Sequence, residues 1–412
     1  MQTKRIVVVG AGPAGIMAAI RASAFSSDVT LVEKNPSLGK KLLLSGKGRS
    51  NLTNACDLQS FLAQFSGNGE FLRDAFKKFF NQDLIAFFEK RGLRLRVERQ
   101  LRVFPATDRA AGVIEVLKKE LLKHKVKLIC GLGMKDIIIR DNSVKGVVLK
   151  DGKIITADKV ILATGGVSYK FTGSSGEGIE LARRLGHRIT PLRPGLVPLE
   201  TRQRYPLQGL ALKNIRLRFS DGQKHIVSEI GELLFTHRGI SGPLVLSLSG
   251  RITDWLQEKK AVRLEIDLKP ALSPQQLEAR LMREFKLNPA KSIKNIMQNL
   301  LPLSLCPVFL KIAGIDPLKK ASYITQNERR QIILLLKALR LDIIKPLPIE
   351  EAMVTRGGVS LKDINPRSME SRLIRGLYFC GEMIDVDADT GGFNLQAAFS
   401  TGYLAGESAA LN

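Results

Sequence analysis

A glycine-rich stretch near the start of the chain constrains its fold more than any other feature. Residues 4–9 form a short run, rich in valine and isoleucine, of the kind that is buried in a parallel sheet. The sequence Gly-Ala-Gly-Pro-Ala-Gly follows at residues 10–15, and residues 16–22 predict a helix. A strand, a glycine-rich turn and a helix in this order are the fingerprint of a dinucleotide-binding fold. The three glycines permit a tight turn, a close approach of backbone to pyrophosphate, and close helix–strand packing, and here they are Gly10, Gly12 and Gly15.

The end of the next predicted strand supports the same interpretation. Residues 28–33 form a second apolar run that ends in Glu33, 18 residues after Gly15. A carboxylate at this position accepts hydrogen bonds from the ribose hydroxyls of adenosine. Because an acid would repel a 2′-phosphate, Glu33 argues against a phosphorylated ribose at this nucleotide. The phosphates are expected at the helix N-terminus, beside Pro13 and Ala14, where free N–H groups and the helix dipole favour anions.

Segments further along the chain favour FAD over NAD. Residues 39–54 combine glycines, cations and small hydrogen-bonding side chains, which can wrap a second phosphate and the ribityl chain of FAD. Residues 157–166 predict a strand that ends in Ala-Thr-Gly-Gly, and residues 376–382 predict a strand that ends in Gly-Glu. Residues 389–398 contain a Gly-Gly pair and begin another helix. We therefore predict that the dinucleotide is FAD.

These segments resemble the two-dinucleotide-domain flavoproteins, and three of them resemble one bacterial family in particular. The three are KLLLSGKGRSNLTN at residues 41–54, GELLFTHRGISGP at 231–243 and DTGGFNLQAA at 389–398. They are similar to the NAD(P)/FAD-dependent, or aminoacetone-oxidase-like, oxidoreductases, which include flavoenzymes that reduce bile-acid enones. The resemblance covers nearly the whole chain. One departure is Ser50, where the family is expected to carry a cysteine, so thiol chemistry at that position is not carried over.

The resemblance implies an FAD that lies along the sheet edge. The backbone near Met134, taken to lie on the strand at residues 127–130, would meet the adenine, and Gly381 and Glu382 would hold the ribityl end. The N–H groups of residues 394–396, at a helix N-terminus, would point at the flavin N1/O2 edge, where reduced flavin carries negative charge. The cofactor residues expected in all are Gly10, Gly12, Pro13, Ala14, Gly15, Glu33, Lys34, Lys41, Ser45, Gly46, Arg49, Asn51, Thr53, Met134, Thr164, Gly165, Gly381, Glu382, Gly392, Asn394, Leu395 and Gln396.

The expected fold is α/β, with a Rossmann-like FAD-binding domain whose parallel sheet has helices on both faces. FAD motifs lie on both sides of a region of different texture, which is therefore an insert. Alternating patterns such as residues 261–267 predict strands, and amphipathic stretches such as residues 332–339 predict helices. The insert is expected to roof the flavin and form the substrate site. The expected boundaries are residues 1–190 and 346–412 for the FAD-binding domain, 191–268 for a β-rich insert, and 269–345 for a helical insert.

Composition narrows the class of protein further. The four cysteines have no closely spaced pair, which disfavours disulfide reductases, a disulfide framework and a zinc site. No apolar run is long enough to span a membrane, and the N-terminus does not resemble a signal peptide, so a cytoplasmic location is expected. The net charge of +25 has two interpretations, a polyanionic partner such as RNA or a generally basic surface, and the second is favoured. The sequence does not indicate an oligomeric state.

Catalytic candidates are few, because the flavin itself carries out the redox chemistry. His237 lies in a glycine-rich loop of the insert, where an imidazole suits proton transfer, although it could equally cap a turn. Arg356 lies where the chain returns to the FAD-binding domain and would bind an anionic substrate or the flavin O2, or form a structural ion pair. Tyr169 and Thr236 are weaker candidates.

The predicted function is FAD-dependent oxidation or reduction of a small organic substrate, with reduction of an activated C=C bond as a specific form. The sequence has one dinucleotide fingerprint, so NAD(P)H would reach the flavin only transiently as the electron donor. Two alternatives stay open. One is an RNA-modifying flavoprotein, suggested by the charge, and the other is a flavin-carrying interaction or sensor protein without turnover.

Overall fold

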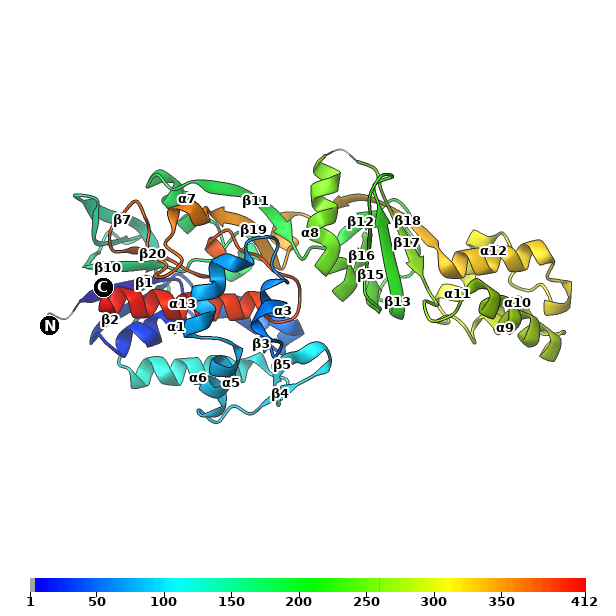
Figure 1. The fold of residues 1–412 in the computed structure, drawn as a ribbon, viewed down its shortest axis with the longest axis horizontal. Coiled ribbons are helices and arrows are strands. Elements are labelled where there is room, and N and C mark those ends of the chain that lie inside the picture. Colours follow the sequence, from blue (N-terminus) through cyan, green and yellow to red (C-terminus); the bar gives the residue numbers. More distant parts are fainter. Residues whose placement is uncertain (1–3, 259) are drawn as a thin grey trace. The chain divides into compact units, whose positions relative to one another are not determined.

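The chain folds into two compact units in a computed structural model that describes residues 4–258 and 260–412 (Figure 1). The first unit combines Met1–Gly195 with Ile349–Asn412, and the second is Leu196–Pro348. The second unit is thus inserted into the first, which is built from both ends of the chain.

A five-stranded parallel sheet forms the centre of the first unit. Its spatial order is β20-β10-β1-β2-β6, and each neighbouring pair is parallel. After β1 the chain adds β2 and β6 on one side of it, and then β10 and β20 on the other side. The order therefore reverses between β1 and β10, which is the switch point where such sheets bind ligands. The strands are β1 (Arg5–Val9), β2 (Asp28–Glu33), β6 (Lys127–Cys130), β10 (Lys159–Leu162) and β20 (Leu377–Phe379).

Helices α1 (Pro13–Ser23) and α13 (Phe393–Leu411) lie side by side in the first unit (Figure 1). Two glycines of α13 make the close packing feasible. A Cβ at Gly402 would lie 2.1 Å from the carbonyl oxygen of Ala14, and one at Gly406 would lie 2.3 Å from that of Ala18. Aromatic packing holds the start of α13. The rings of Phe61 and Phe393 pack edge to face, and their centroids are 4.7 Å apart.

Smaller elements complete the first unit. Two three-stranded antiparallel sheets have the orders β3-β5-β4 and β7-β8-β9, and β11 pairs with β19. The strands are β3 (Thr53–Asn54), β4 (Leu95–Val97), β5 (Arg102–Pro105), β7 (Met134–Arg140), β8 (Ser143–Leu149), β9 (Ile154–Thr156), β11 (Ile189–Gly195) and β19 (Val354–Val359). The helices are α2 (Lys40–Leu44), α3 (Leu58–Leu62), α4 (Arg73–Lys78), α5 (Asn81–Glu89), α6 (Ala110–Lys123) and α7 (Glu177–Arg184).

The second unit is built on a closed antiparallel barrel. Its strands follow the order β14-β13-β15-β16-β12-β18-β17, and an additional pairing of β13 with β17 closes the ring. Along β13 the inward side chains are apolar and alternate with exposed ones, as the sequence pattern predicts. The strands are β12 (Leu199–Thr201), β13 (Ala211–Ser220), β14 (His225–Val227), β15 (Gly231–Phe235), β16 (Gly239–Ser241), β17 (Val262–Asp267) and β18 (Leu339–Pro346).

Five helices accompany the barrel, and four of them follow one another between β17 and β18. They are α8 (Pro243–Gln257), α9 (Pro274–Leu287), α10 (Ile293–Met297), α11 (Leu305–Ala313) and α12 (Gln326–Lys337). Within the part of the chain that the structure describes, no helix is both long and apolar enough to cross a membrane.

Three details differ from the sequence interpretation. Residues 191–195 continue β11 in the first unit, whereas the insert was expected to begin at residue 191. Residues 339–345, expected to belong to the helical insert, lie in β18, because Leu339, Leu341 and Ile343 alternate at strand period directly after the amphipathic helix α12. Met134 begins β7 and does not lie on β6, since a short turn separates the two strands.

Candidate functional site

The predicted cofactor motifs gather at one edge of the parallel sheet. Because the strands are parallel, their carboxyl ends share that edge, and ligands bind there in open α/β sheets. The glycine turn follows β1, Lys34 follows β2, Thr164 and Gly165 follow β10, and Gly381 and Glu382 follow β20. The fold therefore brings together four segments that lie far apart in the sequence.

The three fingerprint glycines divide into two that pack and one that faces open space. A Cβ at Gly15 would lie 1.8 Å from the carbonyl oxygen of Gly10, and one at Gly10 would lie 2.5 Å from that of Ala163. A Cβ at Gly12 would meet no heavy atom within 4 Å. Gly12 is also the N-cap of α1, and no side chain caps that helix end. This combination of open space and free N–H groups fits the pyrophosphate of FAD.

Glu33 holds the glycine turn in place. One carboxylate oxygen accepts a hydrogen bond from the Ala11 N–H at 2.7 Å, and the other accepts from the Asn35 N–H at 2.8 Å. The side chain is buried, so these bonds fix its position. The contact of Glu33 with a ribose stays a prediction.

A charged network joins several cofactor segments. The Lys41 ammonium donates to both carboxylate oxygens of Glu382, at 2.8 and 2.6 Å, and to the Ser168 hydroxyl at 2.7 Å. The same carboxylate accepts from the Thr355 N–H at 2.8 Å. These bonds tie together α2, the loop after β10, the Gly-Glu turn and β19. We call these four residues the Lys41–Glu382 network.

The loop at residues 45–51 contains buried polar atoms that need a partner. Ser50 is fully buried and has a positive φ of 61°. The Ser50 hydroxyl and the Asn51 side-chain oxygen have no hydrogen-bond partner among the described residues. Buried polar groups are almost always hydrogen-bonded, so their lack of partners fits a polar ligand against this loop.

Arg49, in the same loop, is engaged within the protein. Its guanidinium pairs with Glu98 and Asp108 and lies 4.2 Å from the centre of the Phe104 ring. The hydrogen bonds from Arg49 lower the pKa of both carboxyl groups. Arg49 therefore anchors the loop to β4 and β5, and its contact with the cofactor stays a prediction.

The start of α13 lies against the same loop. Gly392 caps the helix at a φ of +99°, and a Cβ there would lie 2.4 Å from the Thr53 carbonyl oxygen. The first three N–H groups of a helix, here those of residues 393–395, have no partner within the helix. The Gln396 N–H, in contrast, donates to the Gly392 carbonyl at 3.0 Å. The prediction that Gln396 offers its N–H to the flavin is wrong, because that residue already makes the first intrahelical hydrogen bond.

Three further predicted cofactor residues, Lys34, Ser45 and Asn394, form local hydrogen bonds within the fold. The Lys34 ammonium donates to Ser175 at 2.6 Å, and the Ser45 hydroxyl donates to the Leu42 carbonyl at 2.7 Å. The Asn394 amide donates to the Ala388 carbonyl at 2.7 Å and thereby shapes the approach to α13. Their contacts with FAD stay predictions.

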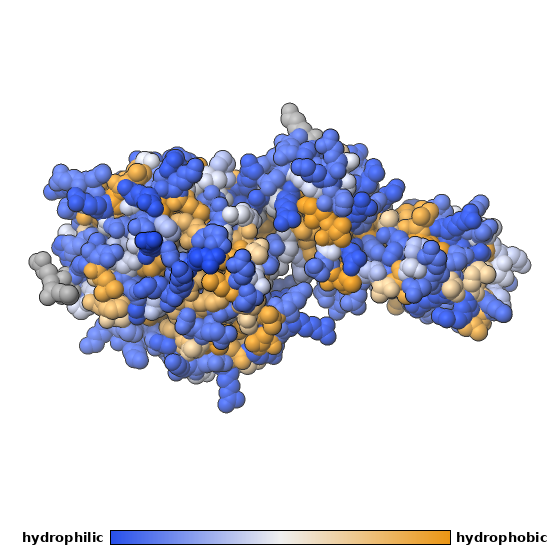
Figure 2. Space-filling view, viewed as in Figure 1, coloured by the Kyte–Doolittle hydropathy of each residue, from blue (hydrophilic) through white to orange (hydrophobic). Residues whose placement is uncertain are grey.

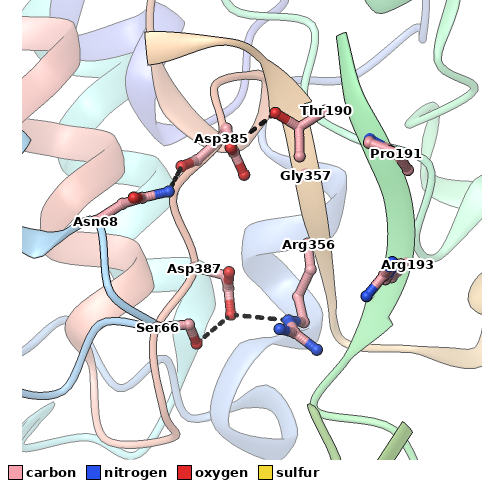
Figure 3. Close-up of a pocket in the computed structure, with 9 residues that line it drawn as sticks. All are labelled: Ser66, Asn68, Thr190, Pro191, Arg193, Arg356, Gly357, Asp385 and Asp387. Atoms are coloured by element: carbon pink, nitrogen blue, oxygen red, sulfur yellow. Dashed lines mark hydrogen bonds and ion pairs between the residues drawn. The ribbon is translucent and has the colours of Figure 1, made fainter. Parts of the chain in front are cut away.

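A polar pocket of about 280 Å³ lies in the first unit between β11, β19 and the segment that leads to α13 (Figure 3). Arg356 and Asp387 face each other across it, and their Nε and Oδ2 atoms are 3.6 Å apart. Ser66 donates to Asp387 at 2.8 Å, and Thr190 donates to Asp385 at 2.8 Å. The pocket is lined by Ser66, Asn68, Thr190, Pro191, Arg193, Arg356, Gly357, Asp385 and Asp387.

Of these pocket residues, only Arg356 was expected from the sequence. The signal that could have revealed more is the Asp-Val-Asp pattern at residues 385–387, which lies between the Gly-Glu and Gly-Gly motifs. Acidic residues between two predicted cofactor motifs are candidates for a substrate site. Arg193 gave no such signal, because its position opposite Arg356 depends on the pairing of β11 with β19.

His237 lies in the second unit, on the turn between β15 and β16. The residue is exposed, and its imidazole forms a hydrogen bond with the Gln208 side chain. Its backbone oxygen accepts from Arg204 at 3.4 Å. His237 and Arg356 thus belong to different units, and a catalytic role for His237 stays a prediction.

Tyr169 begins a turn in the first unit at a φ of 49°. Its half-buried ring lies 6.0 Å from the Lys41 ammonium. Burial raises the pKa of its hydroxyl, which keeps it protonated and able to donate a hydrogen bond at neutral pH. The distance between the ring and the Lys41 ammonium places Tyr169 beside the Lys41–Glu382 network.

The parallel sheet, its switch point at an open Gly12 and its Gly-Glu strand end define a Rossmann-type flavoprotein. The family described as HI0933-like protein Rossmann domain matches residues 4–408, and the chain belongs to that family. It is an FAD-dependent oxidoreductase.

Curated relatives match over nearly their whole length. The chain is 33% identical to a 3-dehydro-bile acid delta(4,6)-reductase of Clostridium scindens, over 98% of this chain and 99% of the relative. It is 30% identical to ribosomal RNA dihydrouridine synthases of Haemophilus influenzae and Escherichia coli, over 96% of this chain and 96% of each relative.

A solved structure shares the fold at low sequence identity. A 3-ketosteroid delta1-dehydrogenase of Sterolibacterium denitrificans superposes with a TM-score of 0.54 and 13% identity, over 100% of both chains. At this identity the likeness concerns the fold alone.

Proposed function

We propose that the protein reduces a C=C bond that is conjugated to a carbonyl group. The observation that carries this proposal is that its near-full-length relatives, named for different substrates, are named for one kind of chemical step. A 3-oxo-delta(4,6) steroid has alkenes conjugated to a ketone, and uracil has a C=C bond conjugated to a carbonyl. Saturating either ring adds a hydride at one carbon and a proton at its neighbour.

Bound FAD would supply the hydride for this reaction. The open space at Gly12, the partnerless polar atoms of Ser50 and Asn51, and the start of α13 are the features that would hold it. NAD(P)H is proposed as a transient donor, because the sequence carries a single dinucleotide fingerprint.

The chain's own contribution is to bind and polarise the substrate carbonyl. Arg356 is suited to this role, since a guanidinium stays protonated and presents several N–H donors in a fixed geometry. Asp387 holds its side chain, and Gly357 follows it on the pocket wall. A donor to the carbonyl oxygen would stabilise the negative charge that develops there as the hydride adds at the conjugated carbon.

The experiment is an anaerobic reduction followed by substrate addition. Purified protein is loaded with FAD and reduced with NADH or NADPH, and a conjugated dienone steroid or a uridine-containing RNA is then added. Recovery of oxidised flavin together with saturated product supports the proposal. Recovery only on admission of oxygen would overturn it in favour of an oxidase, and no bleaching by either donor would exclude NAD(P)H.

Arg356→Lys tests the role of the pocket in the same assay. Lysine keeps the charge but loses the planar set of donors, so reoxidation by substrate should slow about tenfold or more while reduction by NAD(P)H is unchanged. Arg140→Lys, at an exposed position on β7 of the first unit, is the matched control. Equal rates in the Arg356→Lys and control proteins would remove Arg356 from the mechanism.

A second candidate substrate is uridine in RNA. An RNA substrate is compatible with the net charge of +25, and the polar lining of the pocket suits a uracil ring, which both donates and accepts hydrogen bonds. In the assay above, dihydrouridine formation from RNA without any dienone reduction would favour this candidate. The reverse result would favour a small organic substrate.

A further inference from the structure

Two loops of the second unit pair to form a basic surface beside helices α9 to α12. Residues 288–294 follow α9, and residues 314–323 follow α11. The Ile293 N–H donates to the Lys319 carbonyl at 2.8 Å, and the Ala321 N–H donates to the Lys291 carbonyl at 3.0 Å. These backbone bonds join the two loops.

Three lysines of this surface have no acidic partner among the described residues. Lys291 and Lys320 are exposed, Lys294 is partly exposed, and none of the three forms an ion pair with another described residue. Lys319 differs, because it pairs with Glu328 at 2.7 Å. The single acid on the two loops, Asp316, accepts a hydrogen bond from the Leu318 N–H at 2.9 Å.

Large apolar side chains lie among these lysines. Leu287 is 71% exposed, Leu318 is 77% exposed and Tyr323 is 68% exposed. In Figure 2 the region of α9 to α12 shows hydrophobic residues within a mostly hydrophilic surface. Exposed apolar groups next to unpaired charges mark a surface suited to a partner. The paired-loop surface is defined by Leu287, Lys291, Lys294, Leu318, Lys320 and Tyr323.

We propose that the paired-loop surface docks RNA. Lysines bind backbone phosphates, and an exposed tyrosine offers a face on which a base stacks. RNA is a polyanion and therefore complements the excess positive charge of the whole chain. An apolar partner would not be attracted by that charge. This inference rests on the second candidate substrate above, and it assigns RNA docking to residues of the second unit, whereas the polar pocket is lined by residues of the first unit.

The test measures RNA affinity on the full-length, FAD-loaded protein. The probe is a short fluorescein-labelled oligouridylate, titrated at several salt concentrations. The charge-reversal variant is Lys291→Glu/Lys320→Glu. The matched control is Lys119→Glu/Lys123→Glu, which makes the same charge change at exposed positions of α6 in the first unit.

Charge reversal on the surface should weaken binding about tenfold or more at low salt, while the control stays close to wild type. Loss of two phosphate contacts should also lower the slope of log K against log salt by about 1.4, at about 0.7 for each contact to a single strand. Tyr323→Ala should weaken binding about tenfold, and Tyr323→Phe should restore it, because phenylalanine keeps the stacking face. Flavin content serves as the check that each variant is folded.

Three results would overturn the inference. One is absence of oligouridylate binding by the wild type at low salt, and another is equal weakening by the control. The third is a loss of binding to phosphatidylserine-containing vesicles with no loss for RNA, which would make the surface a membrane contact. Reduction of the bound FAD by NAD(P)H, measured on the same variants, is expected to be unchanged. Wild-type protein that binds RNA but saturates neither the dienone nor the uridine substrate would count against the proposed function alone.

Discussion

At the residue scale, two glycines of the turn are expected to have different roles. Gly15 packs against backbone, whereas Gly12 faces the space predicted for the cofactor, and a substitution at each tests this difference. Gly12 has an ordinary φ of −79°, and a Cβ added there would have nothing within 4 Å, so Gly12→Ala should fold normally. The added methyl would occupy the space predicted for the pyrophosphate and should weaken FAD binding about tenfold or more. FAD titration of the apoprotein and its thermal unfolding midpoint measure the two effects.

Gly15→Ala provides the contrast. Its methyl would lie 1.8 Å from the Gly10 carbonyl oxygen, so this variant should lose stability whether or not FAD is present. If Gly12→Ala instead destabilised the apoprotein as much as Gly15→Ala, the space at Gly12 would be structural and would not mark the cofactor.

Asp221 gives a prediction for pH dependence. The backbone N–H groups of Lys224 and Gln223 donate to its carboxylate at 2.6 and 2.9 Å and lower its pKa to about 2. Its pKa in the unfolded chain is about 3.9, so the stabilisation is complete above that pH and is lost as pH falls toward 2. Asp221→Asn should therefore unfold at lower urea concentration than wild type near about pH 6, with a smaller difference near about pH 3. A difference that is the same at both pH values would contradict this explanation.

At the element scale, the contact of α1 with α13 holds the glycine turn against the start of the C-terminal helix. Gly402→Ala would place a methyl 2.1 Å from the Ala14 carbonyl oxygen, and a backbone atom cannot move aside cheaply. We expect a loss of about 3 kcal/mol in the free energy of unfolding, measured by urea denaturation.

A control for this prediction lies on the same helix. Leu411 is 58% exposed at the end of α13, and Leu411→Ala should change the free energy of unfolding by no more than about 0.5 kcal/mol. Comparable losses in the two variants would show that α13 is sensitive along its whole length and that the glycine contacts are not special.

Local pattern is sufficient to predict some elements and not others. The strand, turn and helix at residues 5–23 follow from periodicity and glycine placement, because their signals are local. Strand β18 could not be separated from α12, since the apolar run at the end of this amphipathic helix leads directly into alternating residues. The pocket depends on the pairing of Arg193 with Arg356 across β11 and β19, a contact that no local pattern encodes.

At the scale of the whole molecule, the two ends of the chain build one sheet. Strand β20 pairs with β10 beside β1, although more than half of the sequence separates it from β1. The glycine motifs made it possible to predict that the C-terminal part of the chain rejoins the first sheet, because the Gly-acid pair at residues 381–382 follows a predicted strand. What the motifs could not predict is the Lys41–Glu382 network, since its four members come from four separate segments.

The most direct test of the central claim is a single anaerobic turnover with product analysis. We expect about one FAD for each chain, bleaching by NADH or NADPH, and recovery of oxidised flavin on addition of a substrate with a conjugated C=C bond, with one saturated product formed for each FAD. A protein that binds and reduces FAD but yields no saturated product from either the dienone or the uridine substrate would contradict this claim.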